Sequence, residues 1–149
     1  MKTPIAALLI ISGLFSVSVI FSSCAKADHS ADLPKEQQVV GSWFINRIQL
    51  KIYSGGVFIK DTIIPQTPKP KNFVSFDAAG GFEYRFNSTT SDIGSYSFVG
   101  NDSIVSTSAP KNHRWKMLTL TNKLFTVVTK TTDPAYQGAV VEEYHTFIR

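Results

Sequence analysis

The amino-acid sequence predicts an all-β fold, a small antiparallel up-and-down barrel of eight to nine strands that follows an export signal. From Cys24 onward the chain contains 31 Val, Ile and Thr residues but only 13 Leu and Ala residues, a balance that favours strands over helices. Short apolar segments are separated by Gly, Asn, Asp and Pro, as in hairpin-rich folds. Within several segments apolar and polar side chains alternate, which is typical of a sheet with one packed face.

Residues 1–23 are predicted to be a signal peptide. An uncharged, mainly apolar segment runs from Ile5 to Phe21 and precedes Ser22-Ser23-Cys24, which ends in the only cysteine of the chain. The 17 residues of this segment could form the core of a signal peptide or a minimal membrane-spanning helix. A single cysteine also excludes a disulfide framework within one chain.

The segment Phe21–Cys24 resembles the lipobox of bacterial lipoproteins, in which small residues precede an invariant cysteine. The resemblance implies that Cys24 carries fatty acyl chains such as palmitate and becomes the new N-terminus. Ala25 stands where, under the enterobacterial sorting rule, an aspartate retains lipoproteins at the inner membrane. We therefore expect a lipid anchor in the outer membrane of the cell envelope, on its periplasmic or its surface face. An ordinary secretory signal and an uncleaved anchor are the alternatives, and both export the domain.

Residues 24–40 are expected to form a polar tether, because most of them are small or charged. Asp32 could cap a short helical turn that starts around Leu33-Pro34, since a carboxylate accepts backbone N–H groups and proline is tolerated in the first turn. One globular domain, residues 41–149, follows the tether, and its length suits a single hydrophobic core.

The globular domain is predicted to contain nine strands joined mainly by tight turns. Links such as residues 78–81 and 100–102 hold Gly or Asn residues that tolerate positive φ, so they predict antiparallel hairpins. Two longer connections with prolines, residues 65–71 and 132–138, are expected to be rim loops. The predicted strands are, in order, Ser42–Tyr53, Val57–Ile64, Asn72–Asp77, Phe82–Asn87, Gly94–Val99, Ser103–Thr107, Arg114–Thr121, Leu124–Thr131 and Val140–Ile148.

The first strand illustrates how parity predicts the packed face. Ile48, Leu50 and Ile52 alternate with polar residues, but Trp43 has the opposite parity. A β-bulge near Asn46 is expected to bring both sets to the inner face. Nine strands without a crossover helix leave a closed barrel or a two-sheet sandwich, and consecutive hairpins favour the barrel.

The residues Gly41-Ser42-Trp43 at the head of the first strand resemble the Gly-x-Trp signature of lipocalins. Further segments resemble the lipocalin-like domains of bacterial envelope lipoproteins: Val74–Asp77 with Gly80–Phe82, Ile93–Phe98, and Lys116–Leu124. The resemblance implies that Gly41 allows close packing and that Trp43 plugs the closed end of the barrel. It also implies an arginine that packs over the tryptophan, and Arg149 alone stands in the right place. A second lipocalin block, of the Thr-Asp-Tyr type, has no counterpart.

Composition and motifs argue against several classes of function. The formal net charge of +4 is small and dispersed, which excludes a basic nucleic-acid-binding surface. No nucleophile elbow and no phosphate-binding glycine loop are present, so we expect no enzyme and no cofactor. Glu143 and His145 fall on one strand face and could begin a metal site, but a third ligand is not identifiable, and a solvated Glu-His face is favoured.

Aromatic residues provide the remaining clue to function. They could line a cavity for a small hydrophobic ligand or interlock and fill a narrow barrel. The two hypotheses are a ligand-binding module and a filled barrel that presents its rim loops to a protein or glycan partner. In either case we expect a monomer held to the membrane by its lipid. The residues expected to line such a cavity are Tyr84, Phe86, Tyr96, Phe98 and Leu120.

Two triplets, Asp61-Thr62-Ile63 and Asp102-Ser103-Ile104, resemble the Asp-Ser/Thr-aliphatic consensus for O-glycosylation of exported proteins in some Gram-negative bacteria. The resemblance implies glycans on Thr62 and Ser103 where the host has the modification system.

Overall fold

The structure, a computed structural model, describes residues 33–66, 71–87, 89–133 and 138–149. Cys24, Asp32 and the predicted signal peptide lie outside the described residues. No helix in the described part of the chain is long and apolar enough to cross a membrane. The elements are α1 (Lys35–Gln38), β1 (Gly41–Ser54), β2 (Val57–Pro65), β3 (Phe73–Phe76), β4 (Gly81–Arg85), β5 (Asp92–Val99), β6 (Ser103–Ala109), β7 (Arg114–Leu120), β8 (Leu124–Asp133) and β9 (Ala139–Ile148).

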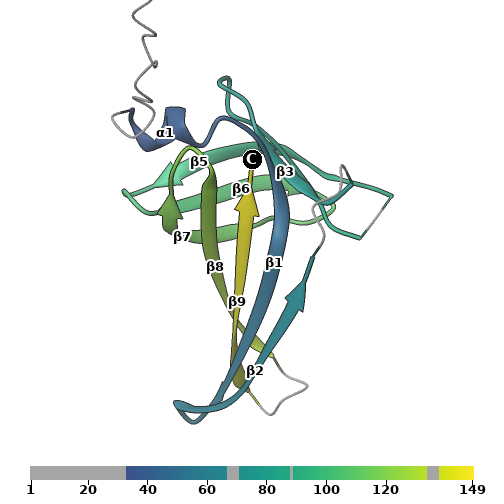
Figure 1. Ribbon diagram of the computed structural model, residues 1–149, viewed down its shortest axis with the longest axis vertical. Helices are drawn as coiled ribbons and strands as arrows, with labels where there is room; N and C mark the ends of the chain where they lie inside the picture. Colours follow the sequence, from purple (N-terminus) through teal and green to yellow (C-terminus); the bar gives the residue numbers. More distant parts are fainter. Residues whose placement is uncertain (1–32, 67–70, 88, 134–137) are drawn as a thin grey trace, which may run out of the picture.

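The strands form a closed antiparallel barrel of eight strands with β2 added outside it, which confirms the predicted fold class. From β3 to β9 each strand pairs with the next, and β1 closes the barrel by pairing with both β3 and β9. The strands from β3 to β9 therefore follow an up-and-down order, as the turn residues predict, whereas the chain between β1 and β3 runs through β2. In Figure 1 the long strands β1, β8 and β9 cross the shorter strands β5, β6 and β7 and continue below them.

β2 and β3 lie along the same edge of β1, one after the other. Residues 57–65 pair with the distal half of β1, and residues 73–76 pair with its first four residues. β2 ends at Pro65, and β3 begins at Phe73. The first half of β1 belongs to the barrel, and the second half forms an arm with β2, β8 and β9 (Figure 1).

The predicted bulge lies at Asn46. The pairing of β1 with β9 shifts register between Ile45 and Arg47, so Asn46 is the extra residue. Trp43, Ile45 and Ile48 consequently all face the interior and are almost completely buried.

The closed end of the barrel is built around Trp43. Its indole Nε1 donates a hydrogen bond to the carbonyl of Val39 at 2.7 Å, and the Arg149 guanidinium lies 3.8 Å from the centre of its ring. The same guanidinium donates to the carbonyl of Val40 at 2.6 Å. Gly41 has φ +118°, and a Cβ there would meet Arg149. Trp43 is thus held between the Val39 carbonyl and the Arg149 guanidinium, while the resemblance to lipocalins stays a prediction.

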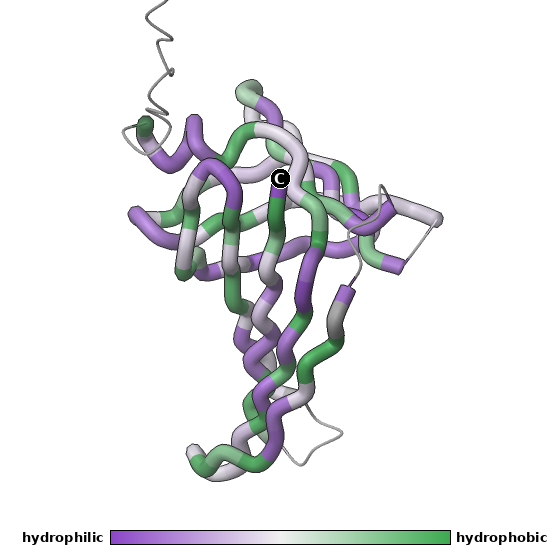
Figure 2. Tube along the Cα trace, in the orientation of Figure 1, coloured by the Kyte–Doolittle hydropathy of each residue, from purple (hydrophilic) through white to green (hydrophobic). Residues whose placement is uncertain are grey.

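Aromatic rings fill the half of the barrel next to this end. Phe125 lies 5.4 Å from both Trp43 and Phe147 and 6.0 Å from Phe76, measured between ring centres. Hydrophilic and hydrophobic residues alternate along the strands that surround these rings (Figure 2). Val39, which the sequence assigns to the tether, is also fully buried, so the packed domain begins before Gly41.

The end of β3 and the start of β5 bear on the position of the candidate site. β3 ends at Phe76 because the Asp77 carboxylate accepts hydrogen bonds from the N–H groups of Ala79 and Gly81, which forms a tight turn. β5 begins at Asp92, two residues before the predicted start. That extension places a carboxylate inside the barrel.

Candidate functional site

Two histidine-carboxylate pairs lie inside the barrel, between the packed aromatic half and the arm. His113 Nε2 is 2.7 Å from Asp92 Oδ2, and His145 Nε2 is 2.7 Å from Glu143 Oε1. Tyr84 lies beside both imidazoles, with ring-centre distances of 4.6 Å to His113 and 6.1 Å to His145. We call these five residues the histidine cluster.

Strand pairing explains how one side of the cluster is assembled. Tyr84 and Asp92 are cross-strand neighbours in β4 and β5, so their side chains share the inner face. His113 is placed by the connection before β7, where its N–H donates to Ser106 Oγ at 2.8 Å and its carbonyl accepts from the N–H of Ser106 at 2.8 Å. Ser106 is itself buried, which fixes this segment against β6.

The other side of the cluster follows from the parity of β9. Glu143 and His145 are two residues apart and pair with Leu50 and Ile48 of β1, which face the interior. The expected common face of Glu143 and His145 is confirmed, but this face is solvated only at Glu143, whose side chain is 39% exposed, because His145 is buried.

Burial and hydrogen bonding set the protonation states. The hydrogen bond from His145 holds the pKa of the Glu143 carboxyl below its ordinary value. Burial lowers the pKa of His113, although the neighbouring Asp92 carboxylate raises it. Burial, followed by the charges of Glu143 and Asp92, raises the pKa of Tyr84. Tyr84 is therefore a neutral phenol at pH 7, and Glu143 is ionised.

The cluster leaves one buried polar atom without a partner. Because Glu143 is an ionised acceptor, His145 Nε2 carries the proton, and in the neutral imidazole Nδ1 is then an acceptor. Nδ1 is the buried side-chain atom that lacks a hydrogen-bond partner among the described residues. No group of three or more His, Cys, Asp or Glu residues in the described part of the chain is arranged to hold a metal ion.

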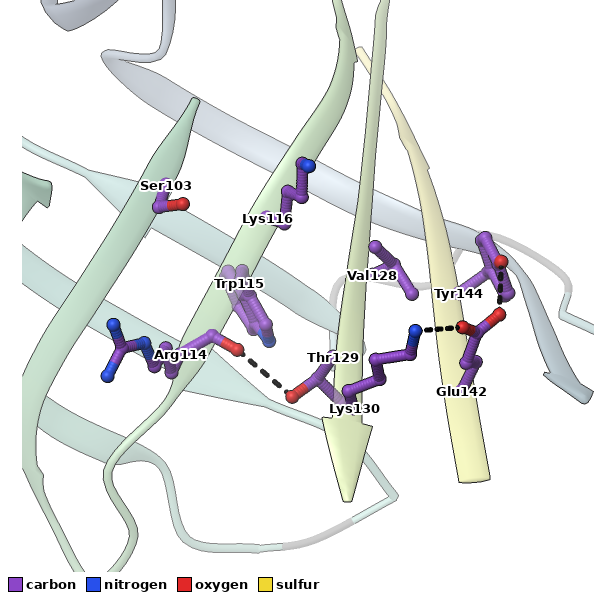
Figure 3. A pocket seen from close by; sticks show the side chains of 9 residues that line it. All are labelled: Ser103, Arg114, Trp115, Lys116, Val128, Thr129, Lys130, Glu142 and Tyr144. Carbon is purple, nitrogen blue, oxygen red and sulfur yellow. Dashed lines mark hydrogen bonds and ion pairs between the residues drawn. The ribbon is translucent and has the colours of Figure 1, made fainter. Parts of the chain in front are cut away.

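A groove of about 380 Å³ lies on the outer surface behind the cluster (Figure 3). It forms where β7 and β8 separate beyond Lys116 and Val128, so that Thr129 Oγ1 donates to the Arg114 carbonyl at 3.0 Å. Lys130 and Tyr144 both contact the Glu142 carboxylate at 2.7 Å. The hydrogen bond to Glu142 raises the pKa of Tyr144 to about 12.

Trp115 separates the groove from the histidine cluster. It lines the groove, and its ring centre lies 5.2 Å from His113 and 6.3 Å from His145. Since Trp115 is 3% exposed, it fills the gap between the strands and keeps the cluster dry on this side.

The five residues expected to line a cavity occupy different parts of the barrel. Tyr84 belongs to the histidine cluster, and Phe86 and Leu120 are half-buried against the core. Tyr96 packs on Phe76 with ring centres 4.9 Å apart and lines, with Phe98, a hollow of about 350 Å³ next to α1. Whether any of these residues contact a ligand stays a prediction.

The proposed glycosylation sites are both half-buried. Thr62 lies in β2 opposite Leu50, on the inner face of the arm. Ser103 Oγ donates to Asp102 Oδ1 at 3.0 Å and lines the outer groove.

Sequence reasoning found Glu143, His145 and Tyr84 but missed the pairing of His113 with Asp92. The start of β5 is obscured by the polar segment that precedes it. A strand extended back by two residues would have placed Asp92 on the face of Tyr84.

No family model matches the chain, and none of the curated proteins matches its sequence.

Proposed function

We propose that this chain is a non-catalytic lipoprotein of the cell envelope that binds a small, largely apolar ligand at the open end of its barrel. Acyl chains on Cys24 would hold it in the outer membrane. The proposal rests chiefly on the partly exposed apolar side chains along the inner face of the arm, next to the buried core.

Three rows of side chains cross the arm from β2 through β1 and β9 to β8. In the first row Ile48, His145 and Val127 are buried against the core, whereas Ile64 of β2 is exposed. The second row contains Leu50 and Glu143, which are half-buried. Exposure increases further in the third row, which ends at Lys60 and Thr131.

Apolar side chains therefore form a partly exposed surface, here called the mouth, next to the buried interior of the barrel. Leu50 in the second row and Ile52 and Val141 in the third remain partly accessible to water. Partly exposed apolar surface beside a few polar groups is a common feature of small-molecule sites.

The histidine cluster supplies polar groups at the inner end of this mouth. The Glu143 side chain is 39% exposed, whereas that of His145 is 6% exposed. A ligand in the mouth would meet the Glu143 carboxylate first, so a ligand with one hydrogen-bond donor and an apolar body fits best. Deeper entry is blocked by the packed rings of Phe125 and Phe147.

Each imidazole of the cluster has one ring nitrogen at a carboxylate, which fixes the orientation of the ring. In the proposed role the cluster orients a bound ligand, while the apolar side chains of the mouth supply most of the contact.

The position of α1 fits an anchor at the closed end. The carbonyl of Gln38, the last residue of α1, accepts a hydrogen bond from Arg149 at 3.0 Å, and the mouth lies at the other end of β1 (Figure 1). A lipid attached a few residues before Leu33 would leave the mouth facing away from the membrane.

Titration with the neutral fluorescent probe N-phenyl-1-naphthylamine tests the proposal. We expect one saturable site, a property that simple partition into detergent does not give. Ile52→Lys should weaken binding by about tenfold or more, since a charge beside an apolar ligand costs at least about 1.4 kcal/mol. Ile93→Lys, on the exposed outer face of β5, is the matched control. Equal probe binding by all three proteins would contradict the proposal.

The second candidate is a filled barrel that acts through a partner. The interlocked rings of the closed half favour it, because they leave that half of the barrel filled. It becomes the better account if the wild-type protein shows no saturable probe binding.

A further inference from the structure

β2 presents an unusual free edge. One edge of β2 pairs with β1, and among the described residues no strand pairs with the other. Val57, Phe58, Ile59 and Ile63 on this strand are between 51% and 64% exposed. Free edges with apolar side chains favour pairing with another strand, and soluble proteins rarely leave them uncovered.

The sequence of β2 is symmetric in polarity about its central residue. Residues 57–59 are apolar, residues 60–62 are Lys-Asp-Thr, and residues 63–64 are two isoleucines. In an antiparallel pair related by a two-fold axis, residue i of one copy meets residue j of the other, and the reverse also holds. The apolar ends would therefore cover each other, while the polar centres would meet.

The charges at the centre are compatible with this pairing. Two Asp61 side chains would face each other at the axis, but each accepts a hydrogen bond from Gln49 Nε2 at 2.7 Å and lies opposite Lys51 in the register of β1 and β2. The Lys51 ammonium lies 5.0 Å from the centre of the Tyr144 ring, so the hydrogen bond from Gln49 is the contact that holds each Asp61 carboxylate. Lys60 of one copy would meet the uncharged Thr62 of the other.

We propose that β2 pairs antiparallel with β2 of a second copy of this chain, centred at Asp61, so that one sheet continues through two molecules. The hairpin that joins β1 to β2 lies at the far end of the molecule from α1 (Figure 1), and it includes hydrophobic residues (Figure 2). The pairing leaves both N-terminal helices free. A dimer replaces the monomer expected from the sequence, which gave no sign that this strand lies outside the barrel.

Sedimentation equilibrium of the full-length acylated protein in detergent tests the pairing. We expect the wild type to sediment with twice the protein mass of a monomer. Ile63→Lys, which adds a charge to the apolar end, should shift it to the monomer mass. Ile93→Lys, an equally exposed isoleucine on β5, should remain dimeric. A wild type that stays monomeric at high protein concentration, or an Ile63→Lys variant that stays dimeric, would overturn the proposal.

Photo-crosslinking identifies the occupant of the edge. A photoreactive p-benzoylphenylalanine in place of Asp61 should give a self-crosslinked dimer in the envelope of expressing cells, with peptides of β2 joined to peptides of β2. The same group in place of Ile93 should give none. Crosslinks from position 61 only to a different envelope protein, or no crosslinks at all, would refute a second copy as the occupant.

Discussion

Trp43 depends on contacts from both ends of the chain. Its indole N–H binds the carbonyl of Val39, the guanidinium of Arg149 covers its ring, and Phe125 packs on it from β8. Because these partners come from distant segments, the contacts hold the ends of the barrel wall together. The stability of the closed end should therefore be sensitive to this one side chain.

Trp43→Ala should lower the free energy of unfolding by roughly 3–5 kcal/mol, through lost transfer energy and the cavity left behind. Urea denaturation followed by circular dichroism measures the loss. Leu118→Ala, at an exposed position of β7, is the control and should change stability by less than about 0.5 kcal/mol. A Trp43→Ala protein that melts within a degree or two of the wild type would refute this role.

The histidine cluster makes stability depend on pH. The folded pKa of His113 lies below the ordinary value of 6.5, so the unfolded chain binds the proton more tightly. The stability from neutral His113 is complete above pH 6.5 and is lost as pH falls through the folded pKa. The pKa of Glu143 is likewise lowered from 4.5, so its contribution is complete above pH 4.5 and is lost as pH falls through its folded pKa.

We therefore expect the acid-induced loss of stability to occur in two parts. His113→Gln should flatten the part that begins near pH 6.5, and Glu143→Gln should flatten the part that begins near pH 4.5. Urea midpoints measured at several pH values between 3 and 8 test both. If stability rises on acidification through pH 6, the sign assigned to His113 is wrong.

The sequence predicts only part of the histidine cluster, because alternation shows which residues share a face within one strand but not which residues of different strands meet. Two residues on one strand share a face, so Glu143 and His145 could be placed together. Asp92 and His113 come from different strands, and their meeting depends on the register of β4 with β5 and on Ser106. Neither of these is visible in a periodic pattern.

At the scale of elements, the sequence predicted the bulge in β1 correctly but did not predict that β2 lies outside the barrel. Alternation predicted the bulge at Asn46, because parity must be restored for Trp43 and Ile48 to share the core. The same pattern could not show that β2 leaves the barrel, since strand alternation is the same in a barrel wall and in an arm. The prolines within residues 65–71 predicted a break between two strands, but they did not predict where the second strand would pair.

The contact of β5 with β6 depends on Gly94. A Cβ at this position would overlap the backbone of Thr107 and Ser108, so the strands could not keep their spacing. Gly94→Ala should cost about 1–3 kcal/mol in unfolding free energy, as overpacking does. Ser95→Ala, at the exposed neighbour, should change stability by less than about 0.5 kcal/mol. Chemical denaturation compares them, and equal stabilities would contradict this close approach.

At the scale of the whole molecule, the two ends of the barrel differ in packing. The closed end has Trp43 and Arg149 and lies beside α1, whereas the opposite end continues into the arm, whose inner face carries the half-buried Leu50 and Glu143. This polarity is what would allow a lipid-anchored protein to present a binding mouth away from the membrane.

Cys24→Ser should release the domain from the membrane or leave an unprocessed precursor, because stable anchoring needs more than one acyl chain on the mature N-terminus. Fractionation of expressing cells into membrane and soluble parts measures this. The control is Ser23→Ala, which keeps a small residue before the cysteine and should remain in the membrane fraction. Unchanged membrane association and processing of Cys24→Ser would rule out lipidation at this residue.

Native mass spectrometry of the protein purified from its own membrane tests the central claim most directly. The account predicts a chain that begins at acylated Cys24 and carries a small, non-covalently bound apolar molecule that is lost on activation. A protein with an unmodified N-terminus downstream of Cys24 and no bound mass would contradict both the anchor and the ligand.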